Sequence, residues 1–279
     1  MAAGIGGVKT ADWAELWRQL VEDSERHHRR FPDPGRSERY LRRLQAGPKA
    51  LAGDDPLVDL VAQQLTPDST VLDIGAAAGR WSLRLARAAK RVTAVEPSAQ
   101  LRRSLEEHAW QLGIDNLTVL AATWPECSAP SHDVVLNSHA MYGTADLPAL
   151  VRSMEDHAHK RCIVVMRLID PRGAMAELSS ELRGHPHDSA NFTIGYNVLL
   201  GMGRCPNVVM DSVVKHWRDA DLDSAVARAR RHLYLAPTDS SHDGSIRRVL
   251  SGRLERTGQG LRWPDRSRSA LVWWDPPAG

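Results

Sequence analysis

Residues 71–80 read VLDIGAAAGR, a short apolar run that ends in a turn of very small residues. This pattern predicts a strand, a tight turn and the start of a helix. Small side chains let a ligand approach the backbone, and a helix N-terminus adds amide donors and the positive end of the helix dipole. Asp73 stands two residues before Gly75. An acidic group at this place could face a cationic part of a ligand.

A carboxylate also ends the next apolar run. Residues 91–96 read RVTAVE, so Glu96 closes the second predicted strand. A carboxylate in this position can accept hydrogen bonds from both hydroxyls of a ribose. The two segments together indicate a nucleoside-containing ligand.

Strand and helix patterns alternate along the centre of the chain. The predicted strands are 71–75, 91–96, 117–122, 132–138, 161–168 and 269–275. The helices predicted between them are 80–89, 99–112 and 147–157. Such alternation predicts βαβ units and therefore an α/β fold with a Rossmann-like, doubly wound sheet. In the last strand, Trp273 and Trp274 are expected to be buried.

The two ends of the chain are less regular. Helical spacing predicts further helices over 12–30, 37–45, 56–65, 173–183, 222–235 and 245–256. Residues 207–217 are a candidate strand. The apolar stretch 192–202 is either a wall or lid over a substrate or ordinary core, and the sequence favours neither. The N-terminal helix with Trp13 and Trp17 either covers a cofactor or packs on the sheet.

The segment 71–80 resembles the first motif of the class I S-adenosylmethionine-dependent methyltransferases, in which apolar residues precede Asp-x-Gly-x-x-x-Gly. The resemblance covers roughly residues 55–170 and, more loosely, the final strand. It implies a mostly parallel sheet with an antiparallel C-terminal strand. It also implies an N-terminal helical cap over 1–55 and a methyltransferase domain over 56–279. Insertions are expected at about 171–205 and 219–266.

The resemblance further implies that S-adenosylmethionine is the cofactor. The family often has an Asp after the third strand for the adenine, but residues 122–126 read ATWPE, so Thr123 or Trp124 would have to cover it. Ala77 stands where the family often has a further glycine. The predicted cofactor-binding residues are Asp73, Gly75, Ala77, Gly79, Glu96, Pro97, Thr123, Trp124 and Asn137.

Two other interpretations of the motif stay open. One is a Rossmann-like domain without a nucleotide, whose glycines serve only tight packing. The other is a nicotinamide enzyme, although its fingerprint spaces the glycines as Gly-x-Gly-x-x-Gly. The observed spacing favours the methyltransferase.

The loop after the fourth strand, residues 137–142, reads NSHAMY. Ligands of open α/β sheets lie beyond the carboxyl ends of the strands, and in the family this loop lies beside the transferred methyl group. His139 is therefore the predicted base and Tyr142 the predicted pocket residue. The alternative is that His139 is a hydrogen-bonded residue at a strand end without chemistry. The loop lacks a Pro-Pro-Tyr type motif, which disfavours methylation of exocyclic amines.

His185, His187 and Asp188 have the residue types of a metal site, but they stand in a polar sequence typical of a solvated turn. We therefore predict no metal, and keep His187 as a second candidate base. The pair His27 and His28 is expected on the surface of a helix.

The charge of the chain favours a small-molecule substrate. The net charge over 279 residues is +2, which gives no general attraction to nucleic acid. Residues 228–268 nevertheless hold ten Arg against four acidic residues. An RNA or protein methyltransferase using that Arg-rich segment therefore stays open, as does a non-enzymatic module that binds S-adenosylmethionine. Oxygen is the acceptor atom that general frequency favours.

Three widely spaced cysteines without a CxxC pair are typical of a reducing cytoplasm. No run of about 18 apolar residues predicts a membrane span, and the N-terminus does not resemble a secretory signal. The predominance of Ala and Arg suggests a bacterial source. The sequence does not indicate an oligomeric state.

Overall fold

A computed structural model describes residues 12–32 and 55–277. Its centre is a seven-stranded sheet with the order β3-β2-β1-β4-β5-β10-β6. The strands are β1 (Thr70–Ile74), β2 (Arg91–Val95), β3 (Leu117–Leu120), β4 (His132–Ser138), β5 (Ala158–Leu168), β6 (Asn207–Met210) and β10 (Arg268–Trp274). β1 to β5 pair in parallel, whereas β10 is antiparallel to both β5 and β6. The predicted Rossmann-like sheet with an antiparallel C-terminal strand is confirmed.

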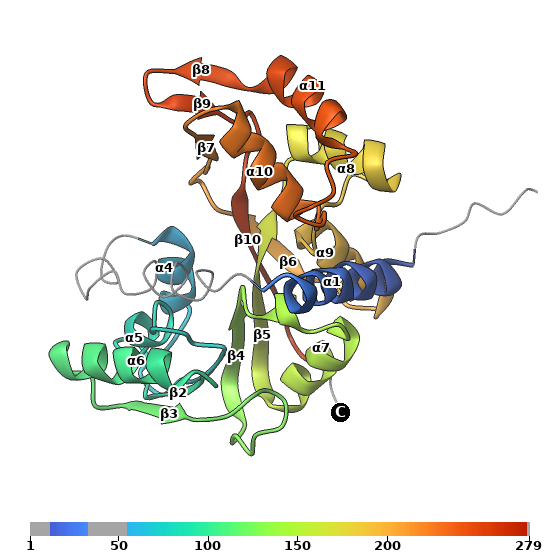
Figure 1. The fold of residues 1–279 in the computed structure, drawn as a ribbon. Coiled ribbons are helices and arrows are strands. Elements are labelled where there is room, and N and C mark those ends of the chain that lie inside the picture. The colour runs from blue at the N-terminus through green and yellow to red at the C-terminus, as the bar shows by residue number, and fades with distance from the viewer. Residues whose placement is uncertain (1–11, 33–54, 278–279) are drawn as a thin grey trace, which may run out of the picture.

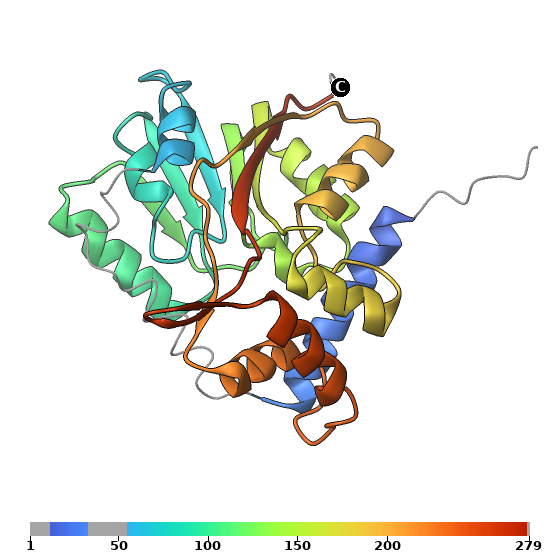
Figure 2. The same cartoon turned by 90° about the horizontal axis from the view of Figure 1, so that it is seen from above.

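Helices cover both faces of this sheet (Figures 1 and 2). One face carries α4 (Pro56–Ala62), α5 (Ser82–Leu85) and α6 (Ala99–Gln111), and the other carries α1 (Trp13–Arg30), α7 (Leu147–Asp156) and α9 (Phe192–Gly201). Successive strand residues point to opposite faces. In β1, Val71 packs towards α4 and α5, whereas Leu72 packs towards α1, α7 and α9.

Side chains that accept amide hydrogens define where several of these helices begin. Asp12 accepts a hydrogen bond of 3.0 Å from the amide of Glu15 at the start of α1. Asp146 does the same for α7, and Asn191 for α9. These caps satisfy donors that a helix leaves unpaired in its first turn.

A second, smaller unit lies beyond the carboxyl ends of the parallel strands (Figure 1). It contains α8 (Ala174–Arg183), α10 (Leu222–His232), α11 (Asp243–Arg253) and a three-stranded sheet of β7 (Arg218–Asp219), β9 (Gly260–Arg262) and β8 (Glu255–Thr257). Its separate apolar core surrounds the fully buried Trp263. This unit therefore covers the sheet edge where ligands of such folds bind.

The structure corrects several element predictions. The helix predicted over 80–89 is reduced to α5, and the strand predicted over 207–217 stops at Met210. Residues 255 and 256 belong to β8 instead of extending the preceding helix, and the three-stranded sheet was not predicted. The apolar stretch 192–202 forms α9, which packs in the main core. The helix predicted over 37–45 lies outside the described residues.

Within the described ranges, no helix has both the length and the apolar character that crossing a membrane requires.

Candidate functional site

The glycine-rich loop after β1 adopts backbone conformations that favour glycine. Gly75 has φ +74° and Gly79 has φ +94°, and Ala77 also has a positive φ of 51°. A Cβ atom on Gly75 would lie 2.3 Å from the Cβ of Ala140, so the loop passes against the segment after β4. A Cβ atom on Gly79 would lie 2.3 Å from Cδ1 of Leu105, which is on α6. Gly75 thus joins two loops of the site, whereas Gly79 permits helix packing.

Glu96 lies at the end of β2 and faces this loop. Its Oε2 accepts a hydrogen bond of 3.0 Å from the amide of Ala77, and its Oε1 accepts one of 2.8 Å from the amide of Ser98. Glu96 is only 6% exposed, yet it lines a cavity of about 660 Å³. A carboxylate oxygen accepts more than one hydrogen bond, so Glu96 retains capacity for hydroxyl donors of a ligand.

Asp73 is buried beside the loop and does not line this cavity. Its carboxylate accepts a hydrogen bond of 2.6 Å from the hydroxyl of Ser82. Burial raises the pKa of Asp73 to about 6, although the bond from Ser82 opposes this shift. The geometry makes Asp73 a support of the turn into α5, and its predicted contact with a cationic ligand group stays a prediction.

A smaller cavity of about 210 Å³ adjoins the first, and Gly75 and Pro97 line both. Thr123, Trp124 and Asn137 line the smaller one. The structure therefore brings the predicted adenine-covering residues to the same place as the loop. Trp124 Nε1 is buried and has no hydrogen-bond partner among the residues that the structure describes.

His139 has a φ of 57°, which is uncommon for a residue with a side chain. Its Nδ1 lies 3.4 Å from Oη of Tyr142, and its Nε2 lies 3.3 Å from Oγ of Ser269. Burial lowers the pKa of His139 to about 4, and the charges of Arg167, Arg80 and Lys215 add to this effect. The imidazole is therefore neutral at physiological pH and lines the 660 Å³ cavity.

Tyr142 is held from several sides. Its Oη accepts a hydrogen bond from the amide of Arg167, and the ring of Trp17 stacks on it with 6.2 Å between centroids. The guanidinium of Arg167 lies 5.4 Å from the ring centroid. Burial raises the pKa of Tyr142, so the phenol keeps its proton. These contacts fix Tyr142 next to His139, and its predicted role in the site stays a prediction.

Trp17 packs in the core and does not line either cavity. It is fully buried, and its Nε1 donates to the carbonyl of Thr144 at 2.9 Å. The part of α1 that lines the larger cavity comes later in the helix: Ser24, Glu25, His28 and Arg29. Sequence reasoning missed these four residues. They continue the apolar stripe of Trp17 and Val21 at helical spacing, which is the signal that could have identified them.

The polar sequence around residue 188 is not a solvated turn. Asp188, Ser189 and Asn191 are each at most 7% exposed. His187 packs edge-on against Trp13, with 6.2 Å between ring centroids. Across the described part of the chain, no group of three or more His, Cys, Asp or Glu side chains is arranged to hold a metal ion.

Comparison with known proteins agrees with this geometry. A family model described as a methyltransferase domain matches residues 71–160, which span β1 to the start of β5. Residues 71–160 of this chain therefore form a methyltransferase domain. The methyltransferase uses S-adenosylmethionine as its cofactor.

Solved structures agree on the fold of the methyltransferase. A putative methyltransferase from Bacillus halodurans C-125 aligns with a TM-score of 0.54 and 11% identity, covering 82% of this chain and 99% of that one. The YcgJ protein from Bacillus subtilis aligns with a TM-score of 0.53 and 15% identity, covering 80% of this chain and 98% of that one. At these identities the similarity shows the shared fold alone. No curated protein matches the methyltransferase in sequence.

Proposed function

We propose that the methyltransferase transfers the methyl group of S-adenosylmethionine to a small-molecule acceptor, with oxygen as the favoured acceptor atom. The observation that carries the proposal is one cavity lined by Gly75 and Glu96 on one side and by His139 and Tyr142 on the other. Predicted cofactor-binding residues and a candidate base thus line one cavity. Its volume of about 660 Å³ is within the range of small-ligand sites.

The residues around the two cavities fit the cofactor. Glu96 would accept the ribose hydroxyls, and the backbone at Gly75 and Ala77 would lie along the methionine part. Thr123 and Trp124, which line the smaller cavity, would cover the adenine. Asn137 holds the neighbouring loop, because its Oδ1 accepts a hydrogen bond of 3.2 Å from the amide of Ala140.

The remaining predicted residues would support this site. Pro97 lines both cavities. Asp73 and Gly79 would stabilise the conformation of the glycine-rich loop after β1. The predicted cap over 1–55 would act through α1, whose second half closes one wall of the larger cavity. These assignments define what mutation should test.

His139 and Tyr142 would carry out the proton chemistry of the transfer. S-adenosylmethionine supplies an electrophilic methyl group on a sulfonium sulfur. A neutral imidazole can accept the proton of an acceptor hydroxyl as the oxygen attacks. Tyr142 would hold the imidazole in place, since its own position is fixed by Trp17 and Arg167.

The alternative of an RNA or protein substrate on the Arg-rich segment is less well supported. Six of the ten arginines between residues 228 and 268 form ion pairs with carboxylates: Arg228, Arg230, Arg247, Arg248, Arg253 and Arg262. Arginines neutralised in this way offer less charge to phosphates. Nothing in the geometry favours the non-enzymatic module.

We also propose that the methyltransferase works in a reducing compartment, namely a bacterial cytoplasm. All three cysteines, Cys127, Cys162 and Cys205, are free. Free thiols fit a reducing environment.

The proposed chemistry is tested by separating cofactor binding from methyl transfer. Purified protein is incubated with S-adenosylmethionine and a panel of small hydroxyl, amine and thiol acceptors, and formation of S-adenosylhomocysteine is measured. His139→Ala should lower the transfer rate about 100-fold or more while the affinity for S-adenosylhomocysteine stays unchanged. Transfer at the wild-type rate by His139→Ala would contradict a base role. A preference for folded RNA over every small acceptor would support the alternative substrate.

A further inference from the structure

The hydroxyl of Ser269 lies beside the ring of His139 without lining the cavities of the site. Ser269 is on β10, and its Oγ lies 3.3 Å from Nε2 of His139. It lines neither the 660 Å³ cavity nor the 210 Å³ cavity, whereas His139 lines the larger one. Ser269 would therefore act on methyl transfer through His139.

Two neighbouring strands fix the position of Ser269. It lies opposite Arg167 of β5 in the antiparallel pairing, and its carbonyl accepts a hydrogen bond of 2.8 Å from the amide of Asp211, just after β6. β10 lies inside the seven-stranded sheet, between β5 and β6. A side chain on such a strand is held more precisely than one on a loop.

His139 is held by its backbone and by both ring nitrogens. Its amide donates a hydrogen bond of 3.0 Å to the carbonyl of Val165 on β5. Its φ of 57° is a conformation that side chains disfavour and that clusters at functional sites. One hydroxyl oxygen lies beside each ring nitrogen, that of Ser269 at Nε2 and that of Tyr142 at Nδ1.

The location of the ring proton decides which nitrogen of His139 can act as a base. Burial, together with the charges of Arg167, Arg80 and Lys215, lowers the pKa of His139 to about 4, so the ring is neutral at physiological pH. A neutral imidazole has one N–H donor and one nitrogen lone pair. The hydrogen bond made by one nitrogen therefore sets the state of the other.

The hydroxyl of Tyr142 indicates how these protons are arranged. Its Oη accepts a hydrogen bond from the amide of Arg167, so the phenol proton is left to donate. Within the described part of the chain, the other hydrogen-bond partner of this hydroxyl is Nδ1 of His139, at 3.4 Å. Nδ1 then has the lone pair, and Nε2–H donates to Oγ of Ser269. The reverse arrangement would leave the phenol proton without an acceptor among the described residues.

We propose that Ser269 is a positioning residue for methyl transfer, which accepts the Nε2 proton of His139 and so keeps Nδ1 as the basic nitrogen. This inference rests on the proposed function, in which His139 takes the proton of the acceptor. The acceptor hydroxyl replaces the phenol hydroxyl as the donor to Nδ1. Its oxygen then bonds to the methyl carbon and displaces the sulfur, which keeps the electron pair of the broken bond. The hydroxyl proton moves to Nδ1, and the imidazolium still donates from Nε2 to Ser269.

The proton arrangement can be measured without knowing the acceptor. Protein with ¹⁵N-labelled histidine is studied by NMR at pH 7, because ring nitrogens with and without a proton have well separated ¹⁵N shifts. The His139 signals are those lost in His139→Ala. We expect the proton on Nε2 in the wild type. Ser269→Ala should lower the ratio of Nε2–H to Nδ1–H about fivefold, the effect of one hydrogen bond, and Ser269→Thr should restore it because threonine keeps a hydroxyl.

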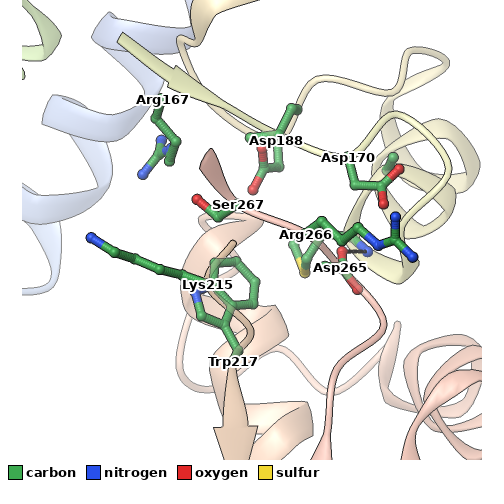
Figure 3. Close-up of a pocket in the computed structure, with 11 residues that line it drawn as sticks. Arg167, Asp170, Asp188, Lys215, Trp217, Asp265, Arg266 and Ser267 are labelled. Carbon is green, nitrogen blue, oxygen red and sulfur yellow. Dashed lines mark hydrogen bonds between the residues drawn. The ribbon is translucent and has the colours of Figure 1, made fainter. Parts of the chain in front are cut away.

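Ser267→Ala is the matched control. It makes the same substitution two residues earlier, on the segment that leads into β10, where Ser267 lines a separate pocket (Figure 3). The backbone of Ser267 pairs with Lys215, but its side chain forms no hydrogen bond with any residue that the structure describes. The tautomer ratio of His139 in this variant should equal that of the wild type.

A kinetic readout links the contact to catalysis. With an acceptor from the screen described above, Ser269→Ala should lower kcat about fivefold at unchanged KM for S-adenosylmethionine, because the bond to Ser269 strengthens as the ring becomes charged. Ser269→Thr should recover kcat.

Three results would overturn the proposal. They are a wild-type proton on Nδ1, a tautomer ratio that Ser269→Ala leaves unchanged, and weaker binding of S-adenosylhomocysteine by Ser269→Ala, which would place Ser269 in support of the cofactor site. If the wild type does not bind S-adenosylhomocysteine at all, the proposed function has failed instead.

Discussion

The amide of Ala77 donates a hydrogen bond of 3.0 Å to Oε2 of Glu96, which joins the glycine-rich loop to the end of β2. The residues are 19 positions apart in the sequence, and the bond holds the loop against a carboxylate that lines the larger cavity. Glu96 therefore fixes the loop, and we propose that its remaining acceptor capacity serves the ribose of the cofactor.

The close approach of Gly75 to Ala140 leads to the first prediction. Gly75→Ala places a Cβ atom 2.3 Å from another carbon at a φ of +74°, so the loop after β4 must move. We expect a loss of roughly 1–3 kcal/mol in the free energy of unfolding and weaker binding of S-adenosylhomocysteine. The control is Gly113→Ala, where φ is +64° but a Cβ atom meets nothing within 4 Å. Denaturant unfolding and calorimetry measure both effects, and equal behaviour of the two variants would contradict the close approach.

Trp17 should be a main support of Tyr142. Trp17→Ala removes a fully buried ring and a hydrogen bond to Thr144, so we expect a loss of about 3–5 kcal/mol in unfolding free energy. Trp110→Ala is the matched control, because Trp110 is 82% exposed and should change stability by less than about 0.5 kcal/mol. Urea denaturation compares the two variants. Similar losses would show that α1 is not packed as described.

Asp73 should make stability depend on pH in an identifiable direction. The pKa of Asp73 is about 6 in the folded protein and near 3.8 in the unfolded chain. Between these pH values, the folded protein therefore binds a proton at Asp73 that the unfolded chain has lost. Stability contributed by this group is therefore present below pH 4 and is lost as pH rises through 6, by about 3 kcal/mol. Asp73→Asn removes the titration. The unfolding free energy of Asp73→Asn minus that of the wild type should rise by about 2.4 kcal/mol from pH 4 to pH 7, since part of the full change lies outside this range.

A control keeps the Asp73 prediction specific. Asp115→Asn makes the same substitution at an exposed carboxylate and is the matched control. A difference for Asp73→Asn that stays constant with pH would mean that Asp73 is not buried next to Ser82.

His139 should remain neutral over the physiological range. Burial and the nearby cations lower its pKa to about 4, so its ring signals should not titrate between pH 5.5 and 8 in NMR spectra. Because this pKa lies below the unfolded value of 6.5, the group contributes stability at neutral pH that is lost as pH falls from 6.5 to 4. A His139 titration near pH 6.5 would show an exposed imidazole, contrary to the geometry of the loop.

Much of the fold follows from the sequence, because the strands of the sheet are apolar runs separated by helices of regular spacing. The three-stranded sheet could not be predicted, since β8 and β9 are three residues each and contain charged side chains such as Glu255 and Arg262. β8 and β9 pair as a short hairpin, but β9 also pairs with β7, which is distant in sequence. The helix after the loop was predicted too long, because Trp81, Leu85 and Ala89 have helical spacing but only one helical turn forms there.

The site was predictable where a motif marks it. Gly75, Glu96 and His139 meet at one cavity, as their positions at strand ends indicate. The orientation of Asp73 was missed, although side chains alternate between the two faces along β1. Asp73 lies on the same face as Val71, so its side chain points towards α5 and Ser82. The wall formed by α1 depends on tertiary packing, which the sequence pattern does not encode locally.

The most direct test of the central claim is calorimetric titration of S-adenosylhomocysteine into the wild type, Glu96→Gln and Glu106→Gln. Glu96 lines the cavity, whereas Glu106 lies exposed on α6 and serves as the matched control. The account predicts micromolar binding by the wild type and by Glu106→Gln, and binding weakened at least about tenfold in a folded Glu96→Gln. A folded wild type that does not bind, or a Glu96→Gln variant that binds equally well, would contradict it.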